Sequence, residues 1–321
     1  MNIVNLRQLA RRHTYLFAFL LLLIALAVNY SLQDNLFQLR VLNSNLRNFL
    51  PLIVLTVGQT IVIVGGGIDL SVGAMVSMAN AILVTLILPD AQAGEILVGI
   101  LVAVAAGLAA GAFNGLCVAY LRLQPIVTTY ATSFVYAGIA LLILPRPGGN
   151  LPREFLRSYR GTPLGIPMPV YFIVLVIVLW LLLRSTRYGQ FLFATGGKAE
   201  SAYATGVNVN FVRFSTYVWA GLFSALAALA LTMNVGTGNP RIGDAMTLDS
   251  IVAVVLGGTR LSGGQGGVVG SVIGVLILGL IRNIISFASV PTWSQTLVDA
   301  LIIIAALAGP GLVQLLRRRS A

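Results

Sequence analysis

The chain has 321 residues, of which 58% are hydrophobic and 9% are charged, whereas roughly a quarter of the residues in a typical soluble domain carry a charge. So few charged side chains cannot cover a soluble globule of this length, and the composition also excludes a disordered chain and a secreted enzyme. A disulfide scaffold is excluded because Cys117 is the single cysteine. The net charge of +11 is explained by basic loops on one side of a membrane, and we expect no nucleic-acid partner. The composition predicts an all-α polytopic membrane protein embedded in a lipid bilayer.

Ten apolar runs are candidate transmembrane segments, and most have the roughly 17–25 residues that a helix needs to cross the hydrocarbon core. In chain order they cover residues 15–30, 49–64, 70–88, 96–121, 126–144, 170–183, 214–235, 250–261, 268–287 and 297–315. The eighth run is too short for a full crossing at about 1.5 Å per residue, so a half-helix that re-enters is the alternative. We therefore expect about ten segments, with a range of eight to ten.

The first segment follows Arg7, Arg11 and Arg12, and this order of charge and apolar residues resembles a signal peptide with a cleavage site at residues 25–27. We interpret it as an uncleaved first helix, because many further crossings follow. If every segment crosses, most Lys and Arg residues fall on the side of the amino terminus, which the positive-inside rule assigns to the cytoplasm. Both termini are thus predicted to be cytoplasmic, although the arginines between residues 146 and 160 run against the rule.

Two polar connections separate the apolar runs. Residues 145–169 contain six prolines and are predicted to form an irregular external segment. Residues 184–213 form the longest polar stretch, on the cytoplasmic side. Neither connection is long enough to hold an active site of its own, so residues 1–321 are predicted to form a single transmembrane domain.

Two octapeptides, at residues 66–73 and 257–264, align without gaps and are identical at five of eight positions. Each follows a run rich in β-branched residues, which predicts two related halves at approximately residues 48–145 and 214–315. Glycine pairs end or break helices because they permit positive φ, and duplicated segments interrupted by glycine are typical of transporters. The candidate gate residues are Gly66, Gly67, Asp69, Ser71 and Gly73 in the first copy and Gly257, Gly258, Arg260 and Ser262 in the second. The sequence leaves open whether the halves are parallel or inverted.

A polar residue directly after a glycine pair can cap the next helix, and Asp69, Ser71 and Ser262 are candidates. Tight turns with caps are one interpretation of the two octapeptides, and broken helices that line a polar path are the other. Asp69 and Arg260 have opposite charges at aligned positions. We therefore hypothesise that they pair and lock one gate, the alternative being that both face cytoplasmic water and never meet.

Four blocks of this sequence, within residues 49 to about 285, resemble the ribose-type sugar permeases of ABC transporters, in the branched-chain amino acid/ribose permease family. They are the octapeptide at residues 66–73 with its approach at 57–63, then residues 111–115, 194–207 and 248–259. One departure is Arg260, where the family pattern implies a small polar residue.

The resemblance implies a permease subunit of a bacterial importer in the inner membrane. A periplasmic binding protein would deliver a monosaccharide, two permease subunits would form the path, and a separate cytoplasmic ABC ATPase would drive alternating access. The resemblance also implies that residues 184–213 form the loop that couples to the ATPase, and we expect about two helical turns at residues 198–205. The loop residues assigned to this role are Gly196, Gly197, Glu200, Ala202, Ala204 and Gly206.

The chain itself has no ATP-binding motif. A phosphate-binding loop has the form G-x-x-x-x-G-K-[ST], and the nearest match, at residues 196–199, lacks both the first glycine and the final hydroxyl residue. Any ATP dependence is therefore expected from a partner chain, and no cofactor or metal is expected in this one. Proton coupling would need several buried acids or histidines, whereas only Asp69 and the peripheral His13 are present.

Polar and aromatic side chains inside the apolar segments are candidates for the translocation path, because a sugar needs hydrogen bonds to its hydroxyls and an apolar surface for its ring. The candidates are Gln59, Asn80, Asn114, Tyr130, Tyr136 and Trp219. Ordinary hydrogen bonding between helices is the alternative for each of them. The scarcity of buried charge favours a neutral solute over an ion.

Two other functions were weighed. A branched-chain amino acid permease of the same architecture would need fixed partners for both charges of a zwitterion, and few are present. An intramembrane enzyme would need a cluster such as Ser with His or two Asp, which one histidine at position 13 and one embedded aspartate cannot build. No catalytic residue is therefore assigned.

Overall fold

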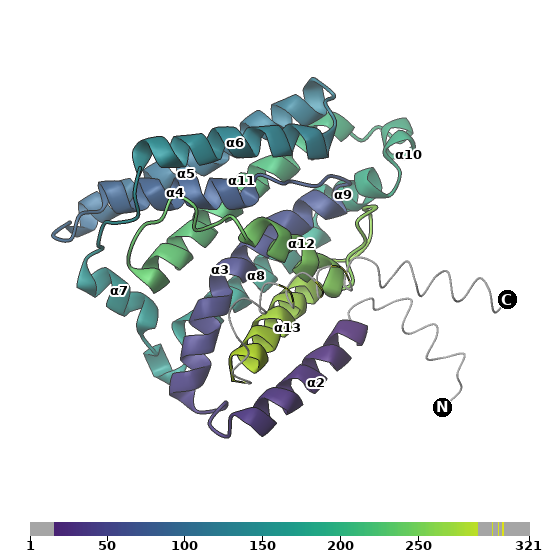
Figure 1. The fold of residues 1–321 in the computed structure, drawn as a ribbon. Helices are drawn as coiled ribbons and strands as arrows, with labels where there is room; N and C mark the ends of the chain where they lie inside the picture. Colours follow the sequence, from purple (N-terminus) through teal and green to yellow (C-terminus); the bar gives the residue numbers. More distant parts are fainter. Residues whose placement is uncertain (1–15, 288–296, 298–300, 302–303, 305–321) are drawn as a thin grey trace, which may run out of the picture.

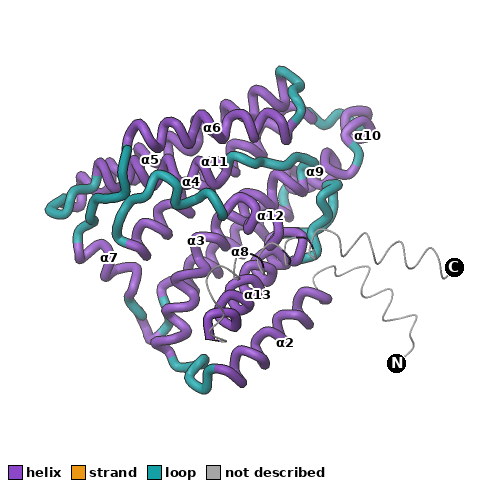
Figure 2. The backbone as a smooth tube through the Cα atoms, in the orientation of Figure 1, coloured by secondary structure: helices purple, strands orange, loops and turns teal. Residues whose placement is uncertain are grey.

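The computed structural model describes residues 16–287 together with residues 297, 301 and 304. In this part of the chain all regular elements are helices (Figures 1 and 2). In chain order they are α2 (Leu16–Leu32), α3 (Leu39–Val64), α4 (Val72–Leu86), α5 (Ala93–Gly115), η1 (Leu116–Tyr120), α6 (Pro125–Ile143), α7 (Arg153–Arg160), η2 (Pro163–Gly165), α8 (Met168–Ser185), α9 (Arg187–Gly197), α10 (Ala199–Ala204), α11 (Val209–Val235), α12 (Met246–Leu256) and α13 (Val268–Phe287). The predicted all-α architecture is confirmed for the described residues.

Several of these helices are long and apolar enough to cross a membrane. Six of them meet that condition: Leu39–Val64, Ala93–Tyr120, Pro125–Ile143, Met168–Ser185, Val209–Val235 and Val268–Phe287. Three apolar helices are shorter: Ala18–Leu32, Val72–Leu86 and Met246–Leu256. The chain is thus a multi-pass helical protein. The predicted number of about ten crossings and the predicted internal repeat stay predictions. The tenth predicted segment, at residues 297–315, lies outside the described residues except for 297, 301 and 304.

The eighth predicted segment corresponds to α12. This helix has 11 residues and is about 16 Å long, roughly half the thickness of the hydrocarbon core. The chain reaches α12 through residues 236–245, none of which is helical. The structure therefore supports the half-helix that the sequence left as an alternative to a full crossing.

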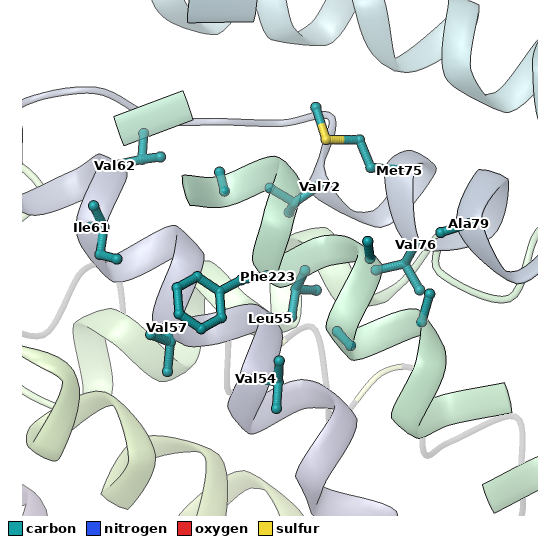
Figure 3. Close-up of a cluster of buried hydrophobic side chains, with 14 of the residues drawn as sticks. Val54, Leu55, Val57, Ile61, Val62, Val72, Met75, Val76, Ala79 and Phe223 are labelled. Atoms are coloured by element: carbon teal, nitrogen blue, oxygen red, sulfur yellow. The ribbon is translucent and has the colours of Figure 1, made fainter. Parts of the chain in front are cut away.

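The central helix is α3, in which every residue from Leu50 to Val64 is buried. A helix that is apolar on all sides is typical of the middle of a large bundle. Figure 3 shows part of this core, where Leu55 and Val57 of α3 lie beside Phe223 of α11. Two glycine-containing breaks between helices, at residues 65–71 and 257–267, join α3 to α4 and α12 to α13.

The packing of α5 on α11 depends on small residues. A Cβ atom on Gly221 would overlap the Gly107 carbonyl oxygen, and one on Gly111 would overlap the Tyr217 carbonyl oxygen. Small residues that let two backbones approach are a common means of helix association in membranes. Because α11 also packs against α3 and α4, it connects the central helix to the outer layer of the bundle.

Two ends of the molecule can be distinguished in Figure 1, with α7 at one and α9 and α10 at the other. The helix α3 begins at Leu39 rather than at residue 49, since its polar first turns pack against α7. There, Asn43 Nδ2 donates to the Arg160 carbonyl oxygen and the Tyr159 hydroxyl donates to the Arg47 carbonyl oxygen, both at 3.0 Å. Hydropathy predicted only the apolar part of this helix.

Candidate functional site

The first glycine break ends α3 with a Schellman motif. Gly65 is the C-cap of α3, and Gly66 takes a left-handed conformation with φ of 88°. The Gly66 N–H donates to the Ile63 carbonyl and the Gly67 N–H donates to the Val62 carbonyl, both at 2.9 Å. These two bonds satisfy carbonyl groups that the helix end leaves free.

The second break ends α12 with the same motif. Gly258 has φ of 85°, and its N–H donates to the Val255 carbonyl, while the Thr259 N–H donates to the Val254 carbonyl. The turn geometry therefore matches Gly65 with Gly257 and Gly66 with Gly258. The gapless alignment, which matched Gly66 with Gly257, is wrong by one residue in the described structure.

The hypothesis that Asp69 and Arg260 form an ion pair is wrong for the described structure. Asp69 is fully buried, Arg260 is exposed, and no ion pair joins them. The shift in register removes their equivalence, and Asp69 finds a nearer partner in Ser71. The alternative, that both residues face water, is wrong for Asp69 as well.

Four predicted residues instead form a buried polar network. The Asp69 Oδ1 atom accepts the Ser71 N–H at 2.8 Å and the Ser71 hydroxyl at 2.6 Å. Asn114 Nδ2 donates to Ser71 Oγ at 2.8 Å, and the Tyr136 hydroxyl lies 3.1 Å from Asn114 Oδ1. None of the four is more than 5% exposed. The structure thus joins two predicted gate residues to two predicted path residues.

One oxygen in the network lacks a partner. Asp69 Oδ2 is buried, as is the Tyr217 hydroxyl beside Gly67, and neither has a hydrogen-bond partner among the described residues. A buried polar atom without a partner is costly, so each of these two oxygens is a place where a new hydrogen bond would lower the free energy. Tyr217 was missed by the sequence reasoning, because a single tyrosine in an apolar run carries no distinguishing pattern.

Residues along α4 bond to the first turn of α12 and to the non-helical segment before it. The Gly73 N–H donates to Thr247 Oγ1 at 3.0 Å, and the Gly243 N–H donates to Ser77 Oγ at 2.9 Å. Asn80 Oδ1 accepts the Asn239 N–H at 2.9 Å. Asn80, a predicted path residue, therefore supports residues 236–245 in the structure. Thr247 and Ser77 were missed, although Ser77 lies one turn from Asn80 on α4.

The predicted cap at Ser262 is wrong. The next helix, α13, begins only at Val268, and Ser262 is exposed in the connection before it. Ser71 does occupy the residue before α4, but its hydroxyl donates to Asp69 instead of accepting a backbone N–H of the helix.

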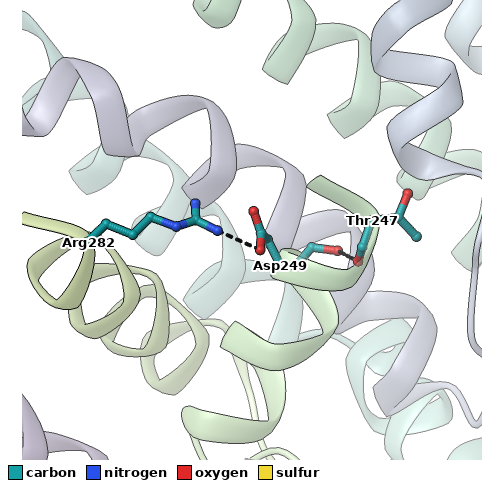
Figure 4. A network of polar contacts seen from close by, with 4 residues as sticks. Thr247, Asp249 and Arg282 are labelled. Atoms are coloured by element: carbon teal, nitrogen blue, oxygen red, sulfur yellow. Dashed lines mark hydrogen bonds and ion pairs between the residues drawn. The ribbon is translucent and has the colours of Figure 1, made fainter. Parts of the chain in front are cut away.

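An ion pair that was not predicted joins α12 to α13. Arg282 Nη2 lies 2.8 Å from Asp249 Oδ1, as Figure 4 shows beside Thr247. The Asp249 side chain is 11% exposed and that of Arg282 is 42% exposed. A charged residue within an apolar helix usually has a partner, and this rule was the available signal. The pairing itself depends on how the two helices pack.

The predicted short helix in the coupling loop is confirmed as α10, shorter by about half a turn than expected. Ala202 and Gly196 are buried, whereas Tyr203 is 75% exposed. Gly197, Glu200 and Ala204 are exposed too, and Gly206 ends the helix with φ of 86°.

A cavity of about 1400 Å³ opens beside α10. Its wall includes Gly66 and Gly67 of the first break, Arg122, Tyr203, Arg213 and Tyr217. The coupling loop and the first break therefore border the same space.

The other predicted path residues lie apart from the network. Gln59 is fully buried in α3, and neither atom of its amide has a hydrogen-bond partner among the described residues. Tyr130 is 57% exposed and packs edge-on against Phe134. Trp219 packs against Phe223, with ring centroids 6.2 Å apart. The path role of these residues stays a prediction.

The architecture, with long apolar helices interrupted by glycine turns around a buried polar network, is typical of a membrane transport protein. Residues 41–307 match the family model described as the branched-chain amino acid transport system / permease component. The chain belongs to this permease family.

Similar proteins extend over most of the chain. It is 33% identical over 291 residues to the ribose import permease protein RbsC of Escherichia coli (strain K12), covering 89% of this chain and 90% of that protein. It is 35% identical over 296 residues to RbsC of Bacillus subtilis (strain 168), covering 91% and 90%. It is 31% identical over 258 residues to the D-allose transport system permease protein AlsC of E. coli (strain K12), covering 80% and 78%. No solved structure matches the chain. These relatives are transport subunits rather than enzymes, and so is this chain.

Proposed function

We propose that this chain is the membrane-spanning subunit of an ATP-driven importer and translocates a monosaccharide delivered by a binding protein. The observation that carries the proposal is the similarity to two ribose import permeases over about nine-tenths of both lengths. The buried network of amide, hydroxyl and phenol groups around Ser71 offers neutral hydrogen-bonding chemistry, which suits a sugar.

The family description names branched-chain amino acids, which makes such a solute the second candidate. A zwitterion needs a fixed partner for each of its charges. The first break offers one buried carboxylate, Asp69, whose Oδ1 atom is already bonded to Ser71. This chemistry favours the sugar.

The proposed topology places α9 and α10 in the cytoplasm and α7 outside the bacterial inner membrane. Both termini are cytoplasmic, and the apolar runs make about ten crossings in two related halves. The exposure of Glu200, Tyr203 and Ala204 on α10 supports this helix as the dock for the ATPase. The opposite end of the molecule then receives the binding protein, and a second permease subunit completes the path.

Transport by reconstituted vesicles tests the proposal. The permease is reconstituted with its partner ATPase and binding protein, and uptake of radiolabelled ribose, allose and leucine is measured with ATP enclosed. We expect uptake of a sugar that requires ATP and the binding protein together. Solute movement by the permease alone would contradict the importer, and uptake of leucine but of no sugar would favour the second candidate.

A further inference from the structure

Three segments that lie far apart in the sequence meet through bare glycine backbones. They are the first break at Gly66, the end of α9 at Gly196 and Gly197, and the second break at Gly263 and Gly264. We call these five residues the glycine junction. It lies at the end of the molecule that carries α10, because only Lys198 separates α9 from α10.

The glycine junction leaves no space for side chains at its centre. A Cβ atom on Gly196 would overlap the Val64 carbonyl oxygen and would lie 2.8 Å from the Gly264 nitrogen. A Cβ atom on Gly263 would lie 2.6 Å from the Gly196 oxygen and 2.9 Å from Gly66 Cα. The three backbones are therefore in direct contact, and Gly196 lies between the two breaks.

A hydrogen bond fixes the two breaks to each other. The Gly264 N–H donates to the Val64 carbonyl oxygen at 2.9 Å. Val64 is the last residue of α3, and carbonyl groups at a helix end have no partner within their own helix. The connection between α12 and α13 thus supplies the partner that the end of the central helix lacks.

Direct backbone contact has a mechanical consequence. Side chains can change rotamer and absorb a small displacement, whereas closely packed backbone atoms pass it on. A displacement of α10 reaches Gly196 within a few residues. At Gly196 it meets Val64 on one side and Gly263 and Gly264 on the other.

We propose that Gly196 is a positioning residue that transmits movement of α10 to both helix breaks at once. The inference rests on the proposed function, in which an ATPase binds α10. In this route, movement of the ATPase passes from α10 through Gly196 to the translocation path, and the two breaks move together. Neither Gly66 nor Gly263 can then respond alone.

The test uses the complete transporter in nanodiscs, with hydrogen exchange followed by mass spectrometry. Exchange is compared between the nucleotide-free and ATP-bound states for peptides that cover α10, residues 61–67 and residues 262–267. In the native transporter we expect both breaks to change exchange when ATP binds. A change in only one break, or in neither while α10 is protected by the ATPase, would overturn the inference.

Two glycine-to-alanine substitutions provide a matched pair. Gly196→Ala places a methyl group inside the junction, whereas a Cβ atom on Gly138 of α6, outside the junction and the coupling loop, has no atom within 4 Å. We expect Gly196→Ala to lower the sugar taken up per ATP hydrolysed by about tenfold and to abolish the ATP response of both breaks, with α10 still protected. Gly138→Ala is expected to behave as the native chain. Equal behaviour of the two variants would overturn the inference.

The experiment separates this inference from the proposed function. If α10 is not protected by the ATPase in the native transporter, the dock itself is wrong. If Gly196→Ala fails to fold, the exchange of the two breaks in the native transporter still decides whether they respond together.

Discussion

At the residue scale, Ser71 is the centre of the buried polar network. Its N–H and hydroxyl both donate to Asp69, and its oxygen accepts from Asn114. Its position follows from the break before α4, which leaves the N–H groups of residues 68–71 without helical hydrogen bonds. The network therefore replaces, in the interior, bonds that a continuous helix would have made.

Replacing Ser71 with alanine should destabilise the protein by about 1–3 kcal/mol, because the Asn114 amide and the Asp69 carboxylate each lose a buried partner. Denaturant unfolding of the purified permease in detergent measures this loss. The control is Ser262→Ala, since this serine is exposed and outside the network, and we expect a change within about 0.5 kcal/mol. Equal losses in the two variants would contradict the network.

At the element scale, α10 is a short helix with one buried and several exposed residues. Ala202 anchors it, while Tyr203 extends into solvent with 75% of its surface exposed. An exposed tyrosine on a rigid element is a common anchor in protein interfaces. This arrangement agrees with a helix that a partner covers.

Replacing Tyr203 with alanine should weaken binding of the ATPase by about 2 kcal/mol or more, since tyrosine is a frequent hot spot. Surface plasmon resonance with the permease in nanodiscs measures the affinity. Thermal unfolding of the permease alone should not change, because the side chain is exposed. A matched control is Tyr30→Ala on α2, which is 52% exposed and should leave binding of the ATPase intact.

The close contact between α5 and α11 leads to a prediction about stability. Gly221→Ala should destabilise the protein by about 1–3 kcal/mol, because the added methyl group overlaps the Gly107 carbonyl oxygen. In contrast, Gly138→Ala on α6 has no atom within 4 Å of the new Cβ, and it should be neutral or stabilising by up to about 1 kcal/mol. Unfolding of both variants in detergent distinguishes the two effects.

At the scale of the whole molecule, positive charge is present at both ends. The short helix α7 exposes Arg153, Arg157 and Arg160 at the end opposite α10. These arginines run against the positive-inside rule if α7 is external. If the binding protein docks at this end, as proposed above, we expect its docking surface to be acidic.

Reversing two of these charges, with Arg153→Glu and Arg157→Glu together, should slow association of the binding protein by about tenfold at low salt. Raising the salt concentration should reduce the difference, because exposed charges are screened. Stopped-flow measurement with a labelled binding protein gives the rate. Arg187→Glu, at the end that carries α9, is the control and should leave this rate unchanged.

The sequence predicted those features of the whole molecule that depend on local patterns. Apolar runs located the helices, glycine pairs located the breaks, and flanking glycines located α10. It did not predict the pairing of Asp249 with Arg282 or the support of residues 236–245 by Asn80, because such contacts depend on the course of non-helical backbone. The same limit explains why the predicted pairing of Asp69 with Arg260 was wrong, since Asp69 instead bonds to Ser71, two residues away in the non-helical segment.

The support of residues 236–245 by α4 has a consequence for biogenesis. Their amides at Asn239 and Gly243 bond to Asn80 and Ser77, which leave the ribosome much earlier. The half-helix α12 follows directly and is too short to span the bilayer unaided. We therefore expect the carboxy-terminal half to insert correctly only where the amino-terminal half is already in place, and two fragments divided between residues 145 and 169 to complement each other when they are co-expressed.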